Sequence, residues 1–127
     1  MMKKTILAVD DDEELLGLLE HILLDSDYQI HTATNGKDAL KLARKLQPDL
    51  ILLDILMPGM NGYEVLEELK RDDDTAMIPV IMLSGLNDER SKVKSAELYS
   101  ESYLTKPFTT TELLSKIEEV LRRRGGG

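Results

Sequence analysis

The sequence contains no cysteine and no long apolar run. Without cysteine the fold has no disulfides, and any metal site must do without thiolate ligands. This absence also suits a reducing compartment, so we expect a cytoplasmic protein. No stretch approaches the roughly 20 apolar residues that cross a bilayer, and Met1–Thr5 leads into a short strand pattern instead of a signal peptide. We therefore expect neither export nor a membrane partner.

The sequence is also short of positive charge. It has 16 Lys and Arg residues against 24 Asp and Glu residues, which gives a formal net charge of -8. Such a domain repels polyanions, so direct binding of nucleic acid is not expected. There is no internal repeat, and 127 residues with 42% apolar content are typical of one globular domain. We expect this domain to end at residue 124, before a glycine tail (125–127) that is either a linker or a cloning remnant.

Short apolar runs alternate with longer stretches of helical spacing along the whole chain. This alternation is typical of repeated strand-helix units, and five such units fit the sequence. The third run, Leu50–Leu53, is apolar at every position, as expected for a central strand with helices over both faces of the sheet. The pattern therefore predicts an α/β fold. The expected strands are Ile6–Val9, Tyr28–Thr34, Leu50–Leu53, Val80–Leu83 and the short Tyr103–Leu104.

Apolar residues at three- and four-residue steps predict the helices between these strands. The expected buried faces are Leu15, Leu18, Leu19 and Ile22 in the first helix, Ala39, Leu40, Ala43 and Leu46 in the second, Val65, Leu66 and Leu69 in the third, and Leu114, Ile117 and Leu121 in the last. Pro48 prevents the second helix from continuing. A fourth helix is expected from a cap at Asp88 to about Tyr99, and the last helix is expected to start at Thr111.

Residues that can handle phosphate follow four of the predicted strands. Asp10 and Asp11 come after the first strand, Asp54 after the third, Ser84 after the fourth and Lys106 after the fifth. The carboxyl ends of parallel strands lie along one edge of a sheet, where open α/β sheets bind ligands. We therefore expect carboxylates, a hydroxyl and an ammonium group to share one pocket.

Each of these residues also has a plainer interpretation when it is taken alone. An isolated Asp10–Asp12 run would be explained by favourable charge at a helix start, and Asp12 is expected to cap the first helix in any case. Ser84 alone would be a turn residue, and Lys106 alone a surface lysine. The run Asp72–Asp74 follows a helical stretch and adjoins no strand end, so we expect a solvated surface turn there.

Four motifs occur in order along the chain: Val9-Asp10-Asp11, Leu53–Gly62, Ser84-Gly85 and Lys106-Pro107-Phe108. Together they closely resemble the receiver domain of two-component response regulators, over almost the whole chain. The resemblance implies a single (βα)5 flavodoxin-like domain with three layers and strand order 2-1-3-4-5, a topology that this family itself exemplifies. It also implies a phosphorylation-dependent signalling switch that catalyses only its own phosphorylation and dephosphorylation, and not a separate enzyme.

The resemblance assigns roles to the residues of the expected pocket. Asp54 would accept a phosphoryl group from the phosphohistidine of a sensor histidine kinase or a histidine phosphotransfer protein. The implied ligands of Mg²⁺ (or Mn²⁺) are the side chains of Asp10, Asp11 and Asp54 and the backbone carbonyl of Leu56. Lys106 would contact a phosphate oxygen, a task that suits a compact ammonium group.

Further residues are implied to transmit and to time the signal. Ser84 would hydrogen-bond the phosphoryl group, and Tyr103 would swing inward as Ser84 moves. The Lys106-Pro107 peptide bond is implied to be cis. The output surface would be the fourth helix, fifth strand and fifth helix, acting on an output domain or a partner protein, with a homodimer after phosphorylation as one plausible form.

The positions two beyond Asp54 and Ser84 tune dephosphorylation in this family, and here they are Leu56 and Leu86. Neither leucine can orient an attacking water, so we expect a long-lived acyl phosphate. One departure is Tyr99-Ser100, where most receivers carry Gly-Ala at the end of the fourth helix. A glycine suits a left-handed helix end, so this difference makes the geometry of the output surface less predictable.

Three other functions compete with this interpretation. The first is a binding module that has lost the chemistry, although none of the required residues is missing. The second is an aspartyl phosphohydrolase, which should have a general-acid Asp at the position of Leu56. The third is a flavin-binding protein, in which Asp10 and Asp11 would repel the flavin phosphate.

Overall fold

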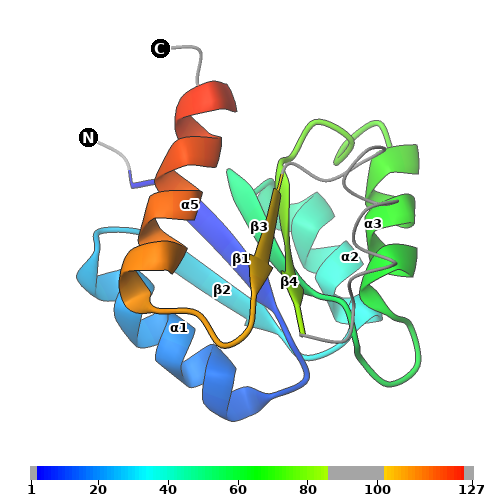
Figure 1. Cartoon of the computed structure of the whole chain (residues 1–127). Helices are drawn as coiled ribbons and strands as arrows, with labels where there is room; N and C mark the ends of the chain where they lie inside the picture. Colours follow the sequence, from blue (N-terminus) through cyan, green and yellow to red (C-terminus); the bar gives the residue numbers. More distant parts are fainter. Residues whose placement is uncertain (1–2, 86–101, 125–127) are drawn as a thin grey trace.

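The computed structural model describes residues 3–85 and 102–124 of the chain (Figure 1). Its elements are β1 (Thr5–Val9), α1 (Glu13–Asp25), β2 (Gln29–Ala33), α2 (Gly36–Leu46), β3 (Leu50–Asp54), α3 (Gly62–Arg71), β4 (Val80–Ser84), β5 (Ser102–Thr105) and α5 (Thr110–Arg124). All five predicted strands are present at their expected places. The predicted fourth helix, from Asp88 to about Tyr99, lies outside the described residues. Leu86 and Ser100 also lie outside them.

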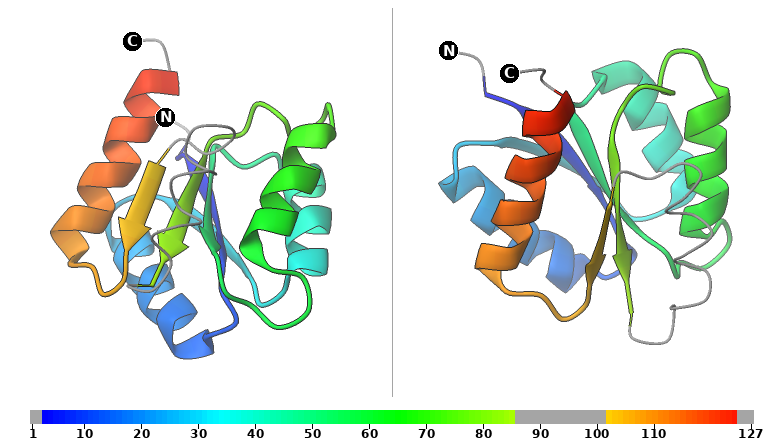
Figure 2. Two further views of the ribbon diagram at one scale, coloured as in Figure 1. Left: turned by 45° about the vertical axis from the view of Figure 1, so that its right-hand side comes forward. Right: turned by 45° about the horizontal axis from the view of Figure 1, so that its top comes forward.

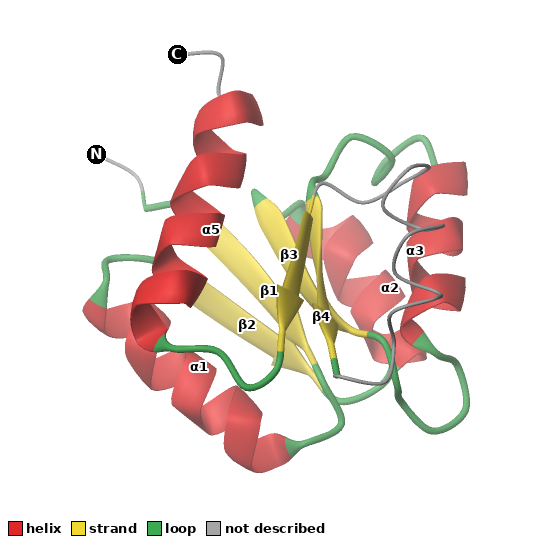
Figure 3. Cartoon of the chain, in the orientation of Figure 1, coloured by secondary structure: helices red, strands yellow, loops and turns green. Residues whose placement is uncertain are grey.

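The strands form one parallel sheet in the order β2-β1-β3-β4-β5, as the resemblance implied (Figure 3). Helices α1 and α5 lie on one face of the sheet, and α2 and α3 lie on the other (Figure 2). The predicted three-layer arrangement is therefore confirmed. Within the described ranges, none of the helices combines the length and the apolar character needed to cross a bilayer.

The core has two apolar layers because successive strand residues point to opposite faces of the sheet. Leu7, Ile51 and other alternate residues pack under α2 and α3. Ile6, Leu50 and their counterparts pack under α1 and α5. Every residue of β3 is buried, which confirms the prediction of a central strand. Burying one leucine or isoleucine contributes about 1.5–3 kcal/mol, so this strand is a main source of stability.

The buried face of α1 differs from the prediction. Leu16, Leu19 and Leu23 form the core face, whereas Leu18 is 54% exposed. The cause is the abundance of leucine in this helix, which creates two apolar stripes offset by one residue. Spacing alone does not distinguish two such stripes, and packing against the sheet selects one of them.

The last helix shows the same kind of shift. Leu113, Ile117 and Val120 are buried, while the predicted residues Leu114 and Leu121 are only partly buried. The helix also begins earlier than Thr111. Reciprocal hydrogen bonds set this start: the Thr109 Oγ1 accepts from the Glu112 N–H at 3.0 Å, and the Glu112 carboxylate accepts from the Thr109 N–H at 2.9 Å.

The remaining helices agree better with their patterns. In α3, Val65, Leu66 and Leu69 are buried as predicted. In α2, Ala39 and Ala43 are buried, while the predicted Leu40 and Leu46 are half-buried. Helix α2 ends one residue before the left-handed Gln47, ahead of the proline that was expected to stop it. Together these two helices cover one face of the sheet.

Candidate functional site

The candidate site lies at the carboxyl edge of the sheet, where β1, β3 and β4 end. The register places Val9 beside Leu53, so that Asp10 and Asp54 follow at neighbouring strand ends. Asp54 is itself paired with Leu83, and Ser84 is paired with Thr105. The parallel topology therefore delivers the predicted residues to one edge, as expected.

Three carboxylates converge at this edge. Asp10 is 1% exposed and Asp54 is 6% exposed, while Asp11 is open to solvent. One carboxylate oxygen from each of them lies within 4.8 Å of the others. Carboxylates at this separation repel one another, and oxygen ligands in such a group suit a hard divalent cation. The group could therefore hold a metal ion, with Asp11 on the solvent side.

Lys106 supplies the positive charge beside this group. Its Nζ donates to Asp10 Oδ2 at 2.8 Å and to Asp54 Oδ1 at 3.0 Å. The Lys106 backbone N–H donates to the Ser84 carbonyl at 2.7 Å, and the Lys106-Pro107 peptide bond is cis. One ammonium group against three carboxylates leaves two excess negative charges, which matches the charge of one divalent cation.

Burial changes the acidity of these groups. It raises the pKa of Asp54 to about 6, and the charges of Asp10 and Asp11 act in the same direction, against the hydrogen bond from Lys106. For Lys106, burial acts to lower the pKa, but the hydrogen bonds to Asp10 and Asp54 outweigh it, and the pKa is raised. Lys106 therefore stays a cation at neutral pH. The high pKa of Asp54 therefore reflects mainly its burial, with a smaller contribution from the neighbouring carboxylates.

The consecutive aspartates after β1 have different tasks. Asp10 has both carboxylate oxygens engaged, since Oδ1 accepts from the Asp12 N–H at 3.0 Å and Oδ2 accepts from Lys106. Asp12 Oδ1 accepts from the N–H groups of Glu14 and Leu15, which confirms its predicted role as the cap of α1. Among the described residues, the Asp11 carboxylate has no hydrogen-bond or ion-pair partner. Asp11 is thus the side chain whose oxygens are open to a ligand.

Ser84 lies at the end of β4 with no exposed surface. Its Oγ has no hydrogen-bond partner among the described residues. A buried hydroxyl that makes no hydrogen bond lowers the stability of a fold by about 1–3 kcal/mol, so native folds usually supply such a group with a partner. Tyr103, which pairs with Met82 in the sheet, is half-buried and packs against the apolar layer under α2 and α3.

The loop after Asp54 brings α3 close to the end of β3. The Gly62 N–H donates to the Ile55 carbonyl at 2.8 Å, and a Cβ at Gly62 would collide with the Asp54 carbonyl oxygen. Sequence reasoning identified this loop but missed the requirement for glycine at its end. The available signal was a glycine directly after Asn61, which caps α3 through a reciprocal bond with Glu64. The Leu56 side chain is 65% exposed beside this loop, whereas Leu86 lies outside the described residues.

Comparison with known proteins gives consistent results. The family described as response regulator receiver domain matches residues 6–118. The alkaline phosphatase synthesis transcriptional regulatory protein PhoP of Bacillus subtilis is 40% identical over 122 residues, which are 96% of this chain and 50% of PhoP. The phosphate regulon transcriptional regulatory protein PhoB of Pseudomonas aeruginosa is 39% identical over 100% of this chain and 56% of PhoB. The chain thus spans about half the length of these curated relatives.

Solved structures show the same fold. The chemotaxis protein CheY4 of Vibrio cholerae superposes with a TM-score of 0.88 at 29% identity, over 94% of this chain and 99% of that one. The signal receiver domain of a histidine kinase from Syntrophus aciditrophicus gives a TM-score of 0.84 at 37% identity, over 93% of this chain and 89% of that one. Both neighbours cover nearly the whole chain.

Proposed function

This chain belongs to the response regulator receiver domain family, the regulatory domains of two-component signalling, and we propose that Asp54 is its phosphoacceptor. The observation that carries the proposal is the double hydrogen bond of Lys106 Nζ to Asp10 and Asp54 beside the exposed Asp11. That arrangement supports a nucleophilic role for the Asp54 carboxylate, because a cation and further carboxylate oxygens lie beside it.

In the proposed reaction, an Asp54 oxygen forms a bond to the phosphorus of a phosphohistidine. The phosphorus–nitrogen bond breaks, and the histidine of a sensor kinase or a histidine phosphotransfer protein leaves with the bonding electron pair. Lys106 stays protonated and exchanges its Asp54 contact for an oxygen of the transferred group. Asp54 must be ionised to attack, so its pKa of about 6 favours reaction at neutral pH over reaction in acid.

The donor set fits a hard divalent cation, and we assign Mg²⁺ (or Mn²⁺) to it. The proposed ligands are the side chains of Asp10, Asp11 and Asp54 and the backbone carbonyl of Leu56. When bound, the cation supplies positive charge that offsets the carboxylates and the incoming phosphoryl oxygens. Asp10, whose oxygens already accept hydrogen bonds, is better placed to act through water than Asp11.

Ser84 and Tyr103 would change position in response to the phosphoryl group. The Ser84 hydroxyl is buried at the strand end beside Asp54, and a new acceptor would satisfy it. Movement of Ser84 toward that acceptor would let Tyr103 turn inward. The signal would leave through the surface of the fourth helix, β5 and α5, of which β5 and α5 belong to the described residues.

This chain matches about half the length of two transcriptional regulators, which supports a role of the domain in controlling an output domain or a separate output protein. Homodimerisation after phosphorylation is one way to exert that control. Direct contact with nucleic acid by this domain is disfavoured by its net charge of -8. We place the protein in the cytoplasm, with no membrane partner.

The chemistry is confined to the domain's own phosphorylation and dephosphorylation. A phosphohydrolase would need an acid two residues after the nucleophile, and the exposed Leu56 stands there. With leucine at positions 56 and 86, we propose a long-lived acyl phosphate. A lifetime of only seconds for the isolated domain in Mg²⁺ would contradict this part.

Acetyl phosphate tests the proposal without knowledge of the kinase. We expect one phosphoryl group on the protein by intact mass spectrometry in Mg²⁺, and no uptake in excess EDTA. Peptide mapping should place the group on Asp54. Equal uptake in EDTA, or a group mapped to another residue, would show that the pocket is not the acceptor site.

A further inference from the structure

A second surface feature lies at the sheet edge farthest from β5, outside the Asp54 site. A groove of about 480 Å³ runs between the end of β2 and the exposed side of α2. Thr32, Ala33 and Thr34 form one wall, and Asp38, Lys41, Leu42 and Lys45 line the other. Its volume falls within the range of ligand-binding clefts.

The groove runs beside an edge strand with unused hydrogen-bonding groups. In the described sheet β2 has only β1 as a neighbour (Figure 3). The Gln29 N–H bonds to the Lys4 carbonyl at 2.9 Å, and the Ala33 carbonyl accepts from the Asp10 N–H at 3.1 Å. Alternate residues of a parallel strand bond to opposite sides, so Ile30 and Thr32 direct their backbone groups outward. Such a row of groups is a template for a further strand.

The charge of this edge is opposite to that of the whole domain. Helix α2 carries four basic residues, Lys37, Lys41, Arg44 and Lys45, against the single acid Asp38, in a chain with a net charge of -8. Arg44 is paired with Asp72. Lys41 and Lys45 have no ion-pair partner among the described residues, and their four-residue spacing puts both on one side of the helix.

We propose that this edge binds an extended acidic segment of a partner protein, which joins the sheet as a sixth strand beside β2. The backbone of the segment would pair with the outward groups of Ile30 and Thr32. Its carboxylates would lie opposite Lys41 and Lys45, and alternate apolar side chains would cover the half-buried Ile30.

The charges argue against two other occupants. A second copy of the chain, added edge to edge, would bring the lysines of both copies together. Nucleic acid would meet a domain whose overall field repels polyanions. A further explanation is that the lysines only protect the edge against unwanted strand pairing, and this explanation predicts that no strand binds.

The test uses a fluorescent, end-blocked peptide of eight residues in which glutamate and valine alternate. We expect saturable binding by fluorescence anisotropy, weaker in high salt, with amide shifts at Ile30 and Thr32 in NMR spectra of the domain. The K41E variant should bind about threefold to tenfold more weakly. The control K37E makes the same charge change on the same helix outside the groove and should bind as the parent does, with thermal unfolding confirming that both variants are folded.

Two further probes separate strand addition from simple charge attraction. The same peptide with alternate N-methyl groups keeps its charges but loses half of its donors, and its binding should fall below detection. A lysine–valine peptide should not bind. The proposal is overturned if the acidic peptide fails to bind, if N-methylation has no effect, if K41E and K37E weaken binding equally, or if a single-stranded oligonucleotide binds more tightly than the peptide. Because D54N should bind the probe normally, this result is independent of the function proposed for Asp54.

Discussion

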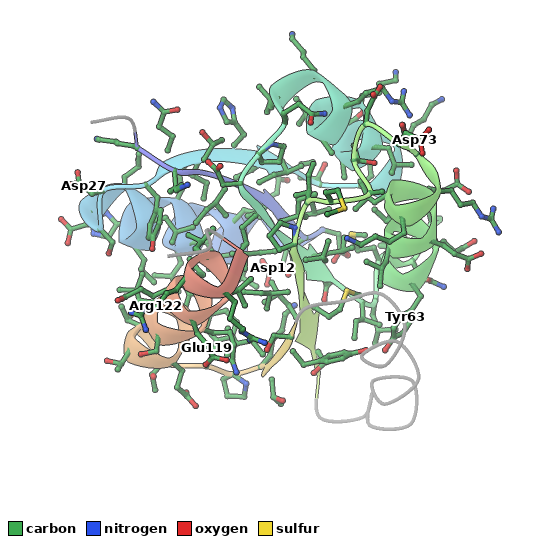
Figure 4. The ribbon with its side chains drawn as sticks, turned by 90° about the horizontal axis from the view of Figure 1, so that it is seen from above. Asp12, Asp27, Tyr63, Asp73, Glu119 and Arg122 are labelled. Atoms are coloured by element: carbon green, nitrogen blue, oxygen red, sulfur yellow. The ribbon has the colours of Figure 1, made fainter. Side chains whose placement is uncertain are left out.

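Two runs of three consecutive aspartates, Asp10–Asp12 and Asp72–Asp74, have different environments in this fold. The first follows β1, and its Asp10 is buried against Lys106. The second follows α3, and Asp73 projects from the surface, well apart from Asp12 (Figure 4). Asp72 Oδ1 accepts from the Asp74 N–H at 2.9 Å, and Asp72 Oδ2 accepts from Arg44 Nε at 2.9 Å. Identical residues thus form part of a charged pocket in one place and a surface turn in the other.

The acidities show what separates the two runs. Asp54, beside the first run, has its pKa raised to about 6 by burial and by two neighbouring carboxylates. Asp72 has its pKa lowered by the Asp74 backbone N–H and by Arg44. In the surface turn, the Asp74 backbone N–H and Arg44 stabilise the ionised Asp72 carboxylate. The pocket has a surplus of negative charge that only a ligand or a proton can offset.

The largest expected difference is in phosphoryl acceptance. D54N removes the nucleophile, so uptake from acetyl phosphate in Mg²⁺ should fall by about 10³-fold or more. D72N makes the same change in the surface turn and should keep the parental rate. Intact mass spectrometry over time measures both variants. Comparable uptake by D54N and the parent would refute the assignment of Asp54.

The second difference concerns the cations that face each run. K106M removes the ammonium group that pairs with the buried Asp10 and Asp54 and should lower the free energy of unfolding by about 2–3 kcal/mol in Mg²⁺-free buffer. R44M breaks an exposed pair with Asp72 and should cost less than about 1 kcal/mol. Urea unfolding monitored by circular dichroism measures these values. Equal losses would mean that burial does not distinguish the two sites.

The pH dependence of stability should have opposite signs at the two sites. The pKa of Asp54 is 3.8 when unfolded and about 6 when folded, so the folded state binds more protons between these values. Its contribution to stability is therefore present in acid and is lost as the pH rises from about 4 to 6, by about 2 kcal/mol in EDTA. D54N should remove this loss.

Asp72 titrates in the other direction. Its lowered folded pKa means that its contribution is present above the unfolded value of 3.8 and is lost as the pH falls further. D72N should reduce the pH dependence of the free energy of unfolding only in this acidic range. Urea unfolding of the parent and both variants between pH 3 and 7, in EDTA, measures the free energy of unfolding against pH. If D54N and D72N changed the same pH range of that curve, the opposite signs predicted for the two sites would be wrong.

Metal affinity should also separate the runs. Asp11 is exposed beside Asp54 and has no partner in the part of the chain that the structure describes, so D11N should weaken Mg²⁺ binding by about tenfold or more. D73N removes a carboxylate that is also exposed, from the surface turn, and should leave affinity unchanged. Isothermal titration calorimetry measures both. A similar decrease in both variants would indicate a general charge effect and no site at Asp11.

The smallest effect is expected at the exposed apolar side chains near each run. Leu56 is 65% exposed two residues beyond Asp54, and Met77 is 75% exposed three residues beyond Asp74. L56N offers an amide that can orient an attacking water and should shorten the acyl phosphate lifetime several-fold. M77N should leave it unchanged. Phosphoryl loss after removal of acetyl phosphate measures this, and an unchanged lifetime in L56N would exclude Leu56 as a tuning position.

Much of the fold could be predicted from the chain alone. The alternation of apolar runs and helical spacing located the strands, and the resemblance supplied the order of the sheet. The errors were in α1 and α5, where several apolar residues offered more than one continuous stripe. The burial of Leu16 in place of Leu18 depended on how the helix packs, which spacing does not encode. Gly62 was missed because its neighbour in space is the Asp54 carbonyl, which lies in another element.

By itself, the sequence determined which residues end each strand, because strand periodicity and chain order are local properties. It therefore identified Asp10, Asp11, Asp54, Ser84 and Lys106 as one set. Only the tertiary structure decided that Lys106 Nζ bridges Asp10 and Asp54, across 96 and 52 positions of the chain, and that the Ser84 hydroxyl is buried without a described partner. Distances, burial and acidity depend on residues that meet only when the sheet and its helices have packed.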